Sequence, residues 1–136
     1  MILLDTNACI SLLNDRDSPV LPYLAEAAGR DESYATSTVV AFELRFGAAK
    51  SELRERNAKR LDVFFRDRIQ VLPFDLDDSR HAGSLRALLE SQGRPIGPFD
   101  TLIAGQALRR DATLLTANIR EFSRVPGLRV IDWSAS

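Results

Sequence analysis

The stretch Met1-Ile2-Leu3-Leu4-Asp5-Thr6-Asn7 opens the chain and decides how the rest of it is arranged. The apolar run Ile2–Leu4 predicts a short buried strand, and the polar residues after it favour the start of a helix. Asp5 is therefore expected at the carboxyl end of a strand. In open parallel sheets ligands bind at this edge, above all where neighbouring strands diverge in chain direction. A carboxylate at this place is a candidate for chemistry.

Length and composition predict a single domain that spans residues 1–136. The chain has 136 residues, 45% of them apolar, which is enough for one continuous core. Its one cysteine, Cys9, excludes an intramolecular disulfide, and the apolar opening lacks the charge and length of a secretory signal. No apolar run reaches the roughly 20 residues of a membrane span. These features favour a soluble, cytoplasmic protein with no membrane contact.

Charge is distributed unevenly along the chain. The formal net charge of −1 argues against binding nucleic acid by bulk electrostatics. Residues 1–44 nevertheless carry two basic and seven acidic side chains, whereas residues 45–68 carry eight basic and four acidic ones. The basic segment is either a solvated helix face, which is the commoner case, or a surface that binds phosphates beside an acidic site. Its candidate RNA-binding residues are Arg54, Arg56, Lys59 and Arg60.

Strand and helix signals alternate, which predicts an α/β fold with a parallel sheet and helices on both sides. Strands are expected at residues 2–4, 33–36, 69–74, 113–116 and 128–131. Helices are expected from a cap at Thr6 or Asn7, from Pro19 to Gly29, from a cap at Ser37 and Thr38, over 51–68, from Asp77 to Gly93, and from Pro98, with a turn or short helix at 117–122. The only histidine, His81, is interpreted as a surface or packing residue.

Two more carboxylates are expected to point inward. Glu43 follows Val39 by four residues and Val40 by three, so it shares their helical stripe. A core-facing acid is costly unless it is paired or binds metal, and a buried ion pair with an arginine is the structural alternative. Asp100 heads the apolar face of its helix. The benign alternative for Asp100 is a favourable interaction with the helix dipole.

A divalent cation would reconcile three gathered carboxylates. Like charges in a partly buried site raise one another's pKa unless a cation neutralises them. Mg²⁺, with Mn²⁺ as a substitute, prefers oxygen ligands, whereas zinc would call for histidines or cysteines that this chain lacks. Two such ions roughly 3.5–4 Å apart activate water and stabilise the leaving oxygen in phosphodiester hydrolysis. An acidic pocket and a phosphate substrate are then compatible.

Four motifs resemble the PIN-domain ribonucleases and, within them, the VapC toxins of bacterial type II toxin–antitoxin systems. The resemblance covers nearly the whole chain and implies a Mg²⁺-dependent endoribonuclease with a three-layer α/β/α fold and sheet order 3-2-1-4-5. It implies that Asp5, Glu43 and Asp100 bind metal and activate water, supported by Thr6, Asn7 and Thr116. The matching segments are Leu3-Leu4-Asp5-Thr6-Asn7, Glu43-Leu44-Arg45-Phe46-Gly47-Ala48, Gly97-Pro98-Phe99-Asp100-Thr101-Leu102-Ile103-Ala104-Gly105 and Leu115-Thr116-Ala117-Asn118-Ile119-Arg120-Glu121-Phe122.

The last motif departs from the family pattern in one place. Many PIN domains have a fourth acid there, often as Thr-Asn-Asp, but this chain has Asn118 at the third position. Glu121, three residues later, is the candidate to serve instead as a fourth catalytic acid. The alternative is that Glu121 is an exposed turn carboxylate and Asn118 a supporting polar group.

The resemblance also implies partners. VapC toxins form homodimers and are silenced by a VapB antitoxin, whose C-terminal segment lies across the toxin and pushes a basic side chain into the acidic site. The phenylalanines Phe42, Phe46, Phe64 and Phe65 exceed what one core requires of two helices, which leaves apolar surface for a partner. Likeness to enterobacterial sequences suggests initiator tRNA, cut in the anticodon loop, as the substrate.

Three other functions compete with the nuclease. A metal-dependent phosphatase with an aspartyl nucleophile typically has a second acid two residues after the first, where this chain has Asn7. A receiver-like phosphoacceptor would be labelled by acetyl phosphate. A non-catalytic PIN fold that binds RNA or protein would need no metal, although all three core acids are present.

Overall fold

Five short strands form one fully parallel sheet in the computed structural model, which describes residues 1–135. The strand order is β3-β2-β1-β4-β5, so the predicted order is confirmed. In chain order the elements are β1 (Ile2–Leu4), α1 (Thr6–Asn14), α2 (Leu21–Gly29), β2 (Tyr34–Ser37), α3 (Thr38–Lys50), α4 (Arg54–Asp67), β3 (Gln70–Leu72), α5 (Leu76–Ser91), α6 (Pro98–Arg109), β4 (Thr113–Thr116), α7 (Ile119–Phe122) and β5 (Val130–Asp132).

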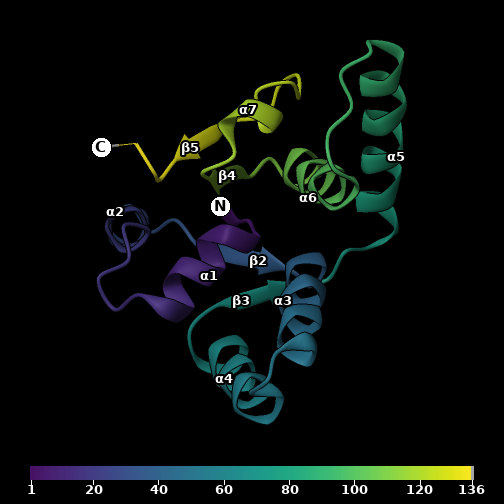
Figure 1. Cartoon of the computed structure of the whole chain (residues 1–136). Helices are drawn as coiled ribbons and strands as arrows, with labels where there is room; N and C mark the ends of the chain where they lie inside the picture. Colours follow the sequence, from purple (N-terminus) through teal and green to yellow (C-terminus); the bar gives the residue numbers. More distant parts are fainter. Residues whose placement is uncertain (136) are drawn as a thin grey trace.

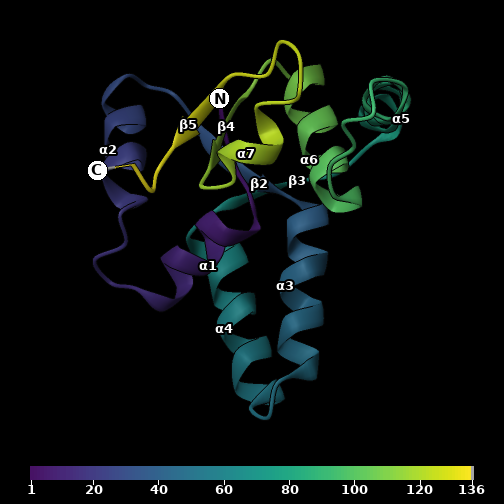
Figure 2. The same cartoon turned by 45° about the horizontal axis from the view of Figure 1, so that its top comes forward.

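The helices cover both sides of the sheet, as the sequence predicts. Figures 1 and 2 show α1, α3 and α4 together on one side, and α5, α6 and α7 on the other. The first strand, β1, lies at the centre, with Leu4 opposite Thr36 of β2 and Leu115 of β4. The chain turns to one side from β1 to β3 and crosses to the other side for β4, so β1 and β4 flank the switch point where such sheets bind ligands.

The core is a single apolar cluster on both faces of the sheet. Residues Ile2–Leu4 of the opening strand are at most 1% exposed, as are Leu114 and Leu115 beside it. Strands buried on both faces have continuous apolar sequences rather than alternating ones. The apolar run Ile2–Leu4 therefore predicted the central strand correctly. No helix within residues 1–135 is long and apolar enough to cross a membrane.

Several helix boundaries differ from those that the sequence predicts. The cap of α1 is Asp5 itself, whose side chain accepts from the Ala8 amide, rather than Thr6 or Asn7. The prediction that Pro19 lies in the first turn of α2 is wrong. The Ser18 hydroxyl stabilises a turn by accepting from the Val20 amide, so the helix begins two residues after Pro19. Ser37 caps α3 as predicted.

The start of α5 was also misplaced by one residue. Asp75 caps this helix in a reciprocal capping box with Asp78, whereas the sequence prediction began the helix at Asp77. Helix α4 begins at Arg54 rather than Ser51, and β3 and β5 are confined to three residues each. His81 lies exposed on α5, as expected of a surface residue. These shifts move helix ends without changing which residues face the centre of the fold.

Helices α5 and α6 pack unusually closely, and this contact orients the helix that carries Asp100. A Cβ atom built on Gly105 of α6 would lie 2.5 Å from the Cα of Ala82 in α5. Real Cβ atoms do not approach backbone so closely. At the far end of α6, Arg110 pairs with the fully buried Asp78 at 3.0 Å. Both contacts fix α6 along its length.

Candidate active site

The carboxyl ends of β1 and β4 bring Asp5 and Thr116 together. Asp5 directly follows β1, and Thr116 is the last residue of β4, in neighbouring parallel strands. The Thr116 hydroxyl donates to Asp5 Oδ2 at 2.5 Å, and both side chains are buried. The other carboxylate oxygen, Oδ1, accepts from the Ala8 amide at 3.0 Å. Asp5 is thus held in one orientation by a strand neighbour and by the helix that it caps.

Burial raises the pKa of Asp5 above its ordinary value. Hydrogen bonds from Thr116 and Ala8 oppose this increase in pKa, and the charge of Glu43 adds to it. The hydrogen bonds stabilise the carboxylate, whereas the neighbouring acid destabilises it. Asp5 therefore gains from any cation that approaches its side chain.

Glu43 faces the same site from α3. Its Oε1 accepts from the Thr6 hydroxyl at 2.8 Å, which joins α3 to the first residue of α1. Glu43 is half-buried, and none of the ion pairs found within residues 1–135 involves it. Glu43 therefore faces inward as predicted. The described residues do not show the alternative, a buried ion pair between Glu43 and an arginine. A carboxylate in this place remains without a cationic partner.

Asp100 and Glu121 form the other half of the site, bridged by Asn118. The Asn118 amide donates to Glu121 Oε2 at 3.1 Å and to Asp100 Oδ2 at 3.4 Å. Its own oxygen accepts from the Glu121 amide and caps α7. An aspartate at position 118 would instead place a third negative charge against the other two. In this chain position 118 therefore holds a neutral hydrogen-bond donor, and the fourth negative charge comes from Glu121 instead.

Burial raises the pKa of Asp100 to about 7, and the proton that it then holds is donated to Glu121. The charges of Glu121, Asp5 and Glu43 add to the effect. The pKa of Glu121 is lowered in turn, first by the hydrogen bond from Asp100, then by those from Asn118 and from the Gly97 backbone N–H. Asp100 and Glu121 therefore behave as a pair of carboxyl groups that share one proton.

The four carboxylates fit a hard cation, although they do not enclose one. Within residues 1–135 no three acidic, histidine or cysteine side chains converge closely enough to hold an ion together. Mg²⁺ usually takes only one or two protein carboxylates and fills its remaining positions with water and substrate phosphate. The donors here are all oxygen atoms, and burial together with the neighbouring acids raises the pKa of Asp5 and Asp100, which a bound cation would oppose. This open set suits Mg²⁺ better than zinc.

The structure gathers most of the predicted site residues and leaves one outside. The charges of Asp5, Glu43 and Glu121 all act on Asp100. Thr6 donates to Glu43, Thr116 to Asp5, and Asn118 to both Asp100 and Glu121. Asn7 is exposed on α1, and none of the side-chain hydrogen bonds of the described residues involves it. Sequence reasoning missed Gly97, where a Cβ would meet Asp100 Oδ2 at 3.6 Å and Glu121 Oε2 at 3.9 Å. Its position directly before the helix-starting Pro98 was the available signal.

The proton on Asp100 predicts how the stability of the metal-free protein depends on pH. Its folded pKa of about 7 exceeds the ordinary 3.8, so between these values the folded protein keeps a proton that the unfolded chain has released. The free energy of unfolding therefore falls as pH rises through this window. Asp100→Asn removes that dependence, so its Tm relative to the parent should be higher at pH 8 than at pH 5.

Thermal unfolding in EDTA from pH 5 to pH 8 measures this effect, with Asp17→Asn on an exposed loop as the control. Parallel curves of Tm against pH for the parent and Asp100→Asn would show that Asp100 does not retain the proton.

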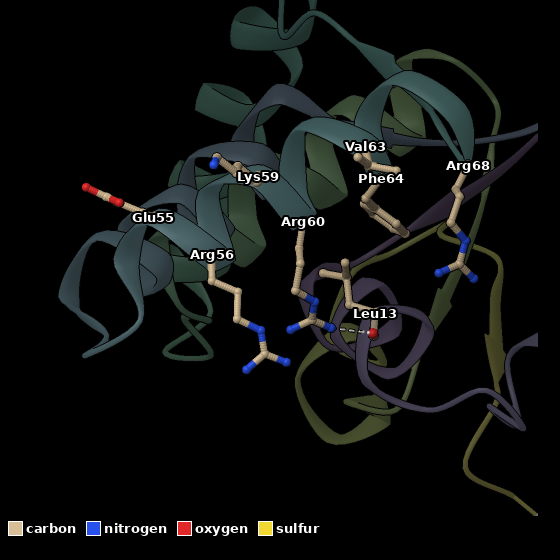
Figure 3. A pocket seen from close by; sticks show the side chains of 8 residues that line it. All are labelled: Leu13, Glu55, Arg56, Lys59, Arg60, Val63, Phe64 and Arg68. Atoms are coloured by element: carbon tan, nitrogen blue, oxygen red, sulfur yellow. Dashed lines mark hydrogen bonds between the residues drawn. The ribbon is translucent and has the colours of Figure 1, made fainter.

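A basic groove lies between α4 and the end of α1 (Figure 3). It has a volume of about 640 Å³ and contains three of the four predicted RNA-binding residues, Arg56, Lys59 and Arg60, together with the unpredicted Arg68. Arg54 does not line it. Glu55 points away from the arginine side chains in the same view. The groove therefore presents a concentrated positive charge despite the acidic net charge of the chain.

Two of these arginines also hold α1 in place. Arg60 Nη2 donates to the Leu13 carbonyl at 2.7 Å and to Asn14 Oδ1 at 3.1 Å, and Arg68 Nη1 donates to the Leu12 carbonyl at 3.0 Å. The last carbonyls of a helix lack partners within it, and cations there are favourable. Arg60 thus has a structural task, which a test of RNA binding must keep separate.

A narrower cleft joins the basic groove to the acids. It has a volume of about 260 Å³ and runs between α1, α3 and α4. Thr6 and Glu43 line it at the acidic end, and Leu13 and Arg60 line both the cleft and the groove. A ligand that spans both cavities would contact cations in one and reach the carboxylates through the other.

Comparison with known proteins agrees with this arrangement. The model of the PIN domain family matches residues 2–128. The chain belongs to the PIN domain family. This PIN domain has β1 and β4 side by side, as the strand order implied by the resemblance requires.

The chain is also similar over nearly its full length to proteins named VapC and to a chain of a solved VapBC complex. It is 42% identical to the tRNA(fMet)-specific endonuclease VapC of Shigella flexneri, over 97% of both chains. It is 37% identical to the protein of the same name from Salmonella typhimurium, over 96% of both. Among solved structures, VapBC2 from Rickettsia felis bound to a promoter DNA fragment superimposes with a TM-score of 0.88 at 36% identity, covering 98% of this chain and 99% of that one.

Proposed function

We propose that this protein is a Mg²⁺-dependent endoribonuclease toxin of the VapC type that hydrolyses phosphodiester bonds in initiator tRNA, in the anticodon loop. The observation that carries the proposal is the gathering of Asp5, Glu43, Asp100 and Glu121 at the switch point, each held by a hydrogen bond from a neighbouring side chain. The similarity to two endonucleases named for tRNA(fMet) supports the substrate. Mn²⁺ is the expected substitute metal.

Asp5, Glu43 and Asp100 are the residues that would hold Mg²⁺, one or two of them to each ion, with water and substrate phosphate as the remaining ligands. When bound, Mg²⁺ would supply Lewis-acid chemistry towards a phosphate oxygen and water. Thr116 and the Ala8 amide fix Asp5 so that its carboxylate needs no reorganisation when substrate binds. Thr6 orients Glu43 in the same way. Asn118 holds Asp100 and Glu121 together by donating to both carboxylates.

The test is cleavage of purified initiator tRNA, compared with elongator methionine tRNA, in Mg²⁺, Mn²⁺ or EDTA, followed by sequencing of the new ends. We expect metal-dependent cuts confined to the anticodon loop of initiator tRNA. Equal cutting of both tRNAs would reject the substrate but keep the nuclease. No cleavage under either metal would reject the enzyme and favour a non-catalytic binding module.

The basic groove is proposed to bind phosphates of the RNA that lie away from the cleaved bond. Each phosphate contact that is lost should flatten the dependence of log affinity on log salt by about 0.7 for single-stranded RNA. Arg56→Gln and Lys59→Gln, both on the exposed face of α4, should each weaken tRNA binding and reduce this slope.

Arg86→Gln, on the exposed face of α5, is the matched control. Titrations at several salt concentrations provide the slopes. If both α4 variants keep the parent's dependence of log affinity on log salt, the basic segment is a solvated helix face and does not bind phosphates. Arg60 is left intact because it also caps α1.

A VapB-like antitoxin is the proposed protein partner, and a homodimer the proposed assembly. Structures with closely similar chains are VapBC complexes from Rickettsia felis, Salmonella typhimurium and Haemophilus influenzae. The cleft between α1, α3 and α4 is suited to receive the C-terminal segment of the antitoxin, because the cleft is mostly apolar and ends at Glu43. A basic side chain entering there would neutralise the carboxylates in place of the metal.

A further inference from the structure

An exposed aromatic track runs from the acidic site along α3. We define it as Phe99, Phe42, Phe46 and Lys50. The three rings are 41%, 54% and 57% exposed, respectively. The Phe99 and Phe42 rings lie 5.5 Å apart, tilted by 47°, and so connect the start of α6 to α3. The Lys50 ammonium lies 5.1 Å from the centre of the Phe46 ring.

The track begins at the carboxylates. Phe99 directly precedes Asp100, and Phe42 directly precedes Glu43. Successive helical residues point about 100° apart, so on α3 the acid faces Thr6 while the ring faces α6. Phe46 and Lys50 follow Phe42 at intervals of four residues, which places all three on one helical face. A molecule bound across Asp100 and Glu43 therefore has these rings beside it.

We propose that this track binds single-stranded RNA by stacking one base on each exposed ring, on one side of the cleaved bond, with Lys50 contacting a phosphate. The inference rests on the proposed endoribonuclease function and deepens it. Aromatic rings interspersed with cations are the composition that single-stranded nucleic-acid sites use. The track is thereby suited to bases and phosphates together, whereas a purely apolar partner would gain nothing from Lys50.

The spacing on α3 also fits separate bases. Phe42 and Phe46 are about 6 Å apart along the helix axis, close to twice the roughly 3.4 Å repeat of stacked bases. One base cannot then cover both rings, so each ring has room for a base of its own. A single-stranded loop presents bases that are free to stack on side chains, whereas a duplex does not. The basic groove lies at α4, so the two surfaces hold different parts of the RNA.

The test separates stacking from simple apolar contact. Phe42→Leu and Phe46→Leu keep apolar bulk but remove the ring, whereas Phe42→Trp keeps a stacking face. Binding is measured by fluorescence anisotropy with a labelled single-stranded oligouridylate, in an Asp5→Asn background that cannot cleave it. We expect each leucine variant to bind about 5- to 100-fold more weakly, and Phe42→Trp to bind as the parent does.

The controls come from exposed residues away from the track. Leu76→Ala, at a side chain that is 86% exposed on α5, should leave affinity unchanged. A 2-aminopurine base in the oligonucleotide should be quenched on binding to the parent and not to Phe42→Leu. Lys50→Gln should flatten the salt dependence, compared with Arg86→Gln.

Two outcomes would overturn the inference. Leucine variants that bind the oligonucleotide like the parent would show that the rings do not stack on bases. A loss of affinity that appears only with a change of oligomeric state, measured by light scattering, would make the track a surface between two copies of the chain. Binding is measured without cleavage. A negative result in the nuclease assay can therefore be distinguished from a negative result in the test of RNA binding by the track.

Discussion

Replacing Asp5 by asparagine is expected to lower the rate of metal-dependent RNA cleavage by at least about 100-fold. Residues that merely orient metal ligands cost 10- to 100-fold when changed, and a direct ligand should cost more. The fold should survive. Asparagine still accepts from the Ala8 amide through Oδ1, and its amide can donate to the Thr116 hydroxyl that now donates to Asp5. Asparagine is also among the best helix caps.

Single-turnover cleavage measures the effect, and circular dichroism checks the fold. Asp17→Asn, on an exposed loop, is the matched control and should cleave like the parent. Full activity in Asp5→Asn that EDTA abolishes would remove Asp5 from the catalytic site. Equal rates in the two variants that EDTA leaves unchanged would instead identify a contaminating nuclease.

Gly105→Ala is expected to destabilise the fold by about 1–2 kcal/mol, the cost of overpacking against backbone less the helix propensity that alanine gains. The added Cβ would lie 2.5 Å from the Ala82 Cα, 2.6 Å from its Cβ and 2.7 Å from its nitrogen. Backbone cannot move aside as a flexible side chain can, so α5 and α6 must separate. Overpacking of this kind typically costs about 1–3 kcal/mol or more, which exceeds the roughly 1 kcal/mol that alanine gains over glycine in a helix.

Gly83→Ala, on α5 itself, is the matched control. A Cβ at Gly83 meets nothing within 4 Å, so this variant should gain up to about 1 kcal/mol from helix propensity alone. Urea unfolding of both variants gives the free energies. Comparable stability of the two variants would show that the helices adjust at little cost. Movement of α6 should also displace Asp100, which lies in its first turn, and so weaken the Mg²⁺ binding proposed above.

The sequence alone determined the sheet and the strand-end carboxylate. Apolar runs buried on both faces are legible without any tertiary information, because each residue of β1 and β4 meets a helix layer. Helical periodicity placed Glu43 and Asp100 toward the interior, and motif resemblance supplied the strand order. Helix ends were less well predicted. Asp5 and Asp75 act as caps because of their local backbone angles. Several polar residues near each helix start are equally good cap candidates by sequence, so the sequence does not select one of them.

Only the tertiary structure decided which polar groups join the acids. Asn118 and Glu121 are near one another in sequence, but their contact with Asp100 depends on where α6 ends up beside β4. The same holds for the clamp from Arg60 to Leu13, which joins residues 47 positions apart. The Phe42–Phe99 pair likewise joins two helices. Periodicity reports which face of an element is buried, whereas contacts between elements follow from the packing of all of them at once.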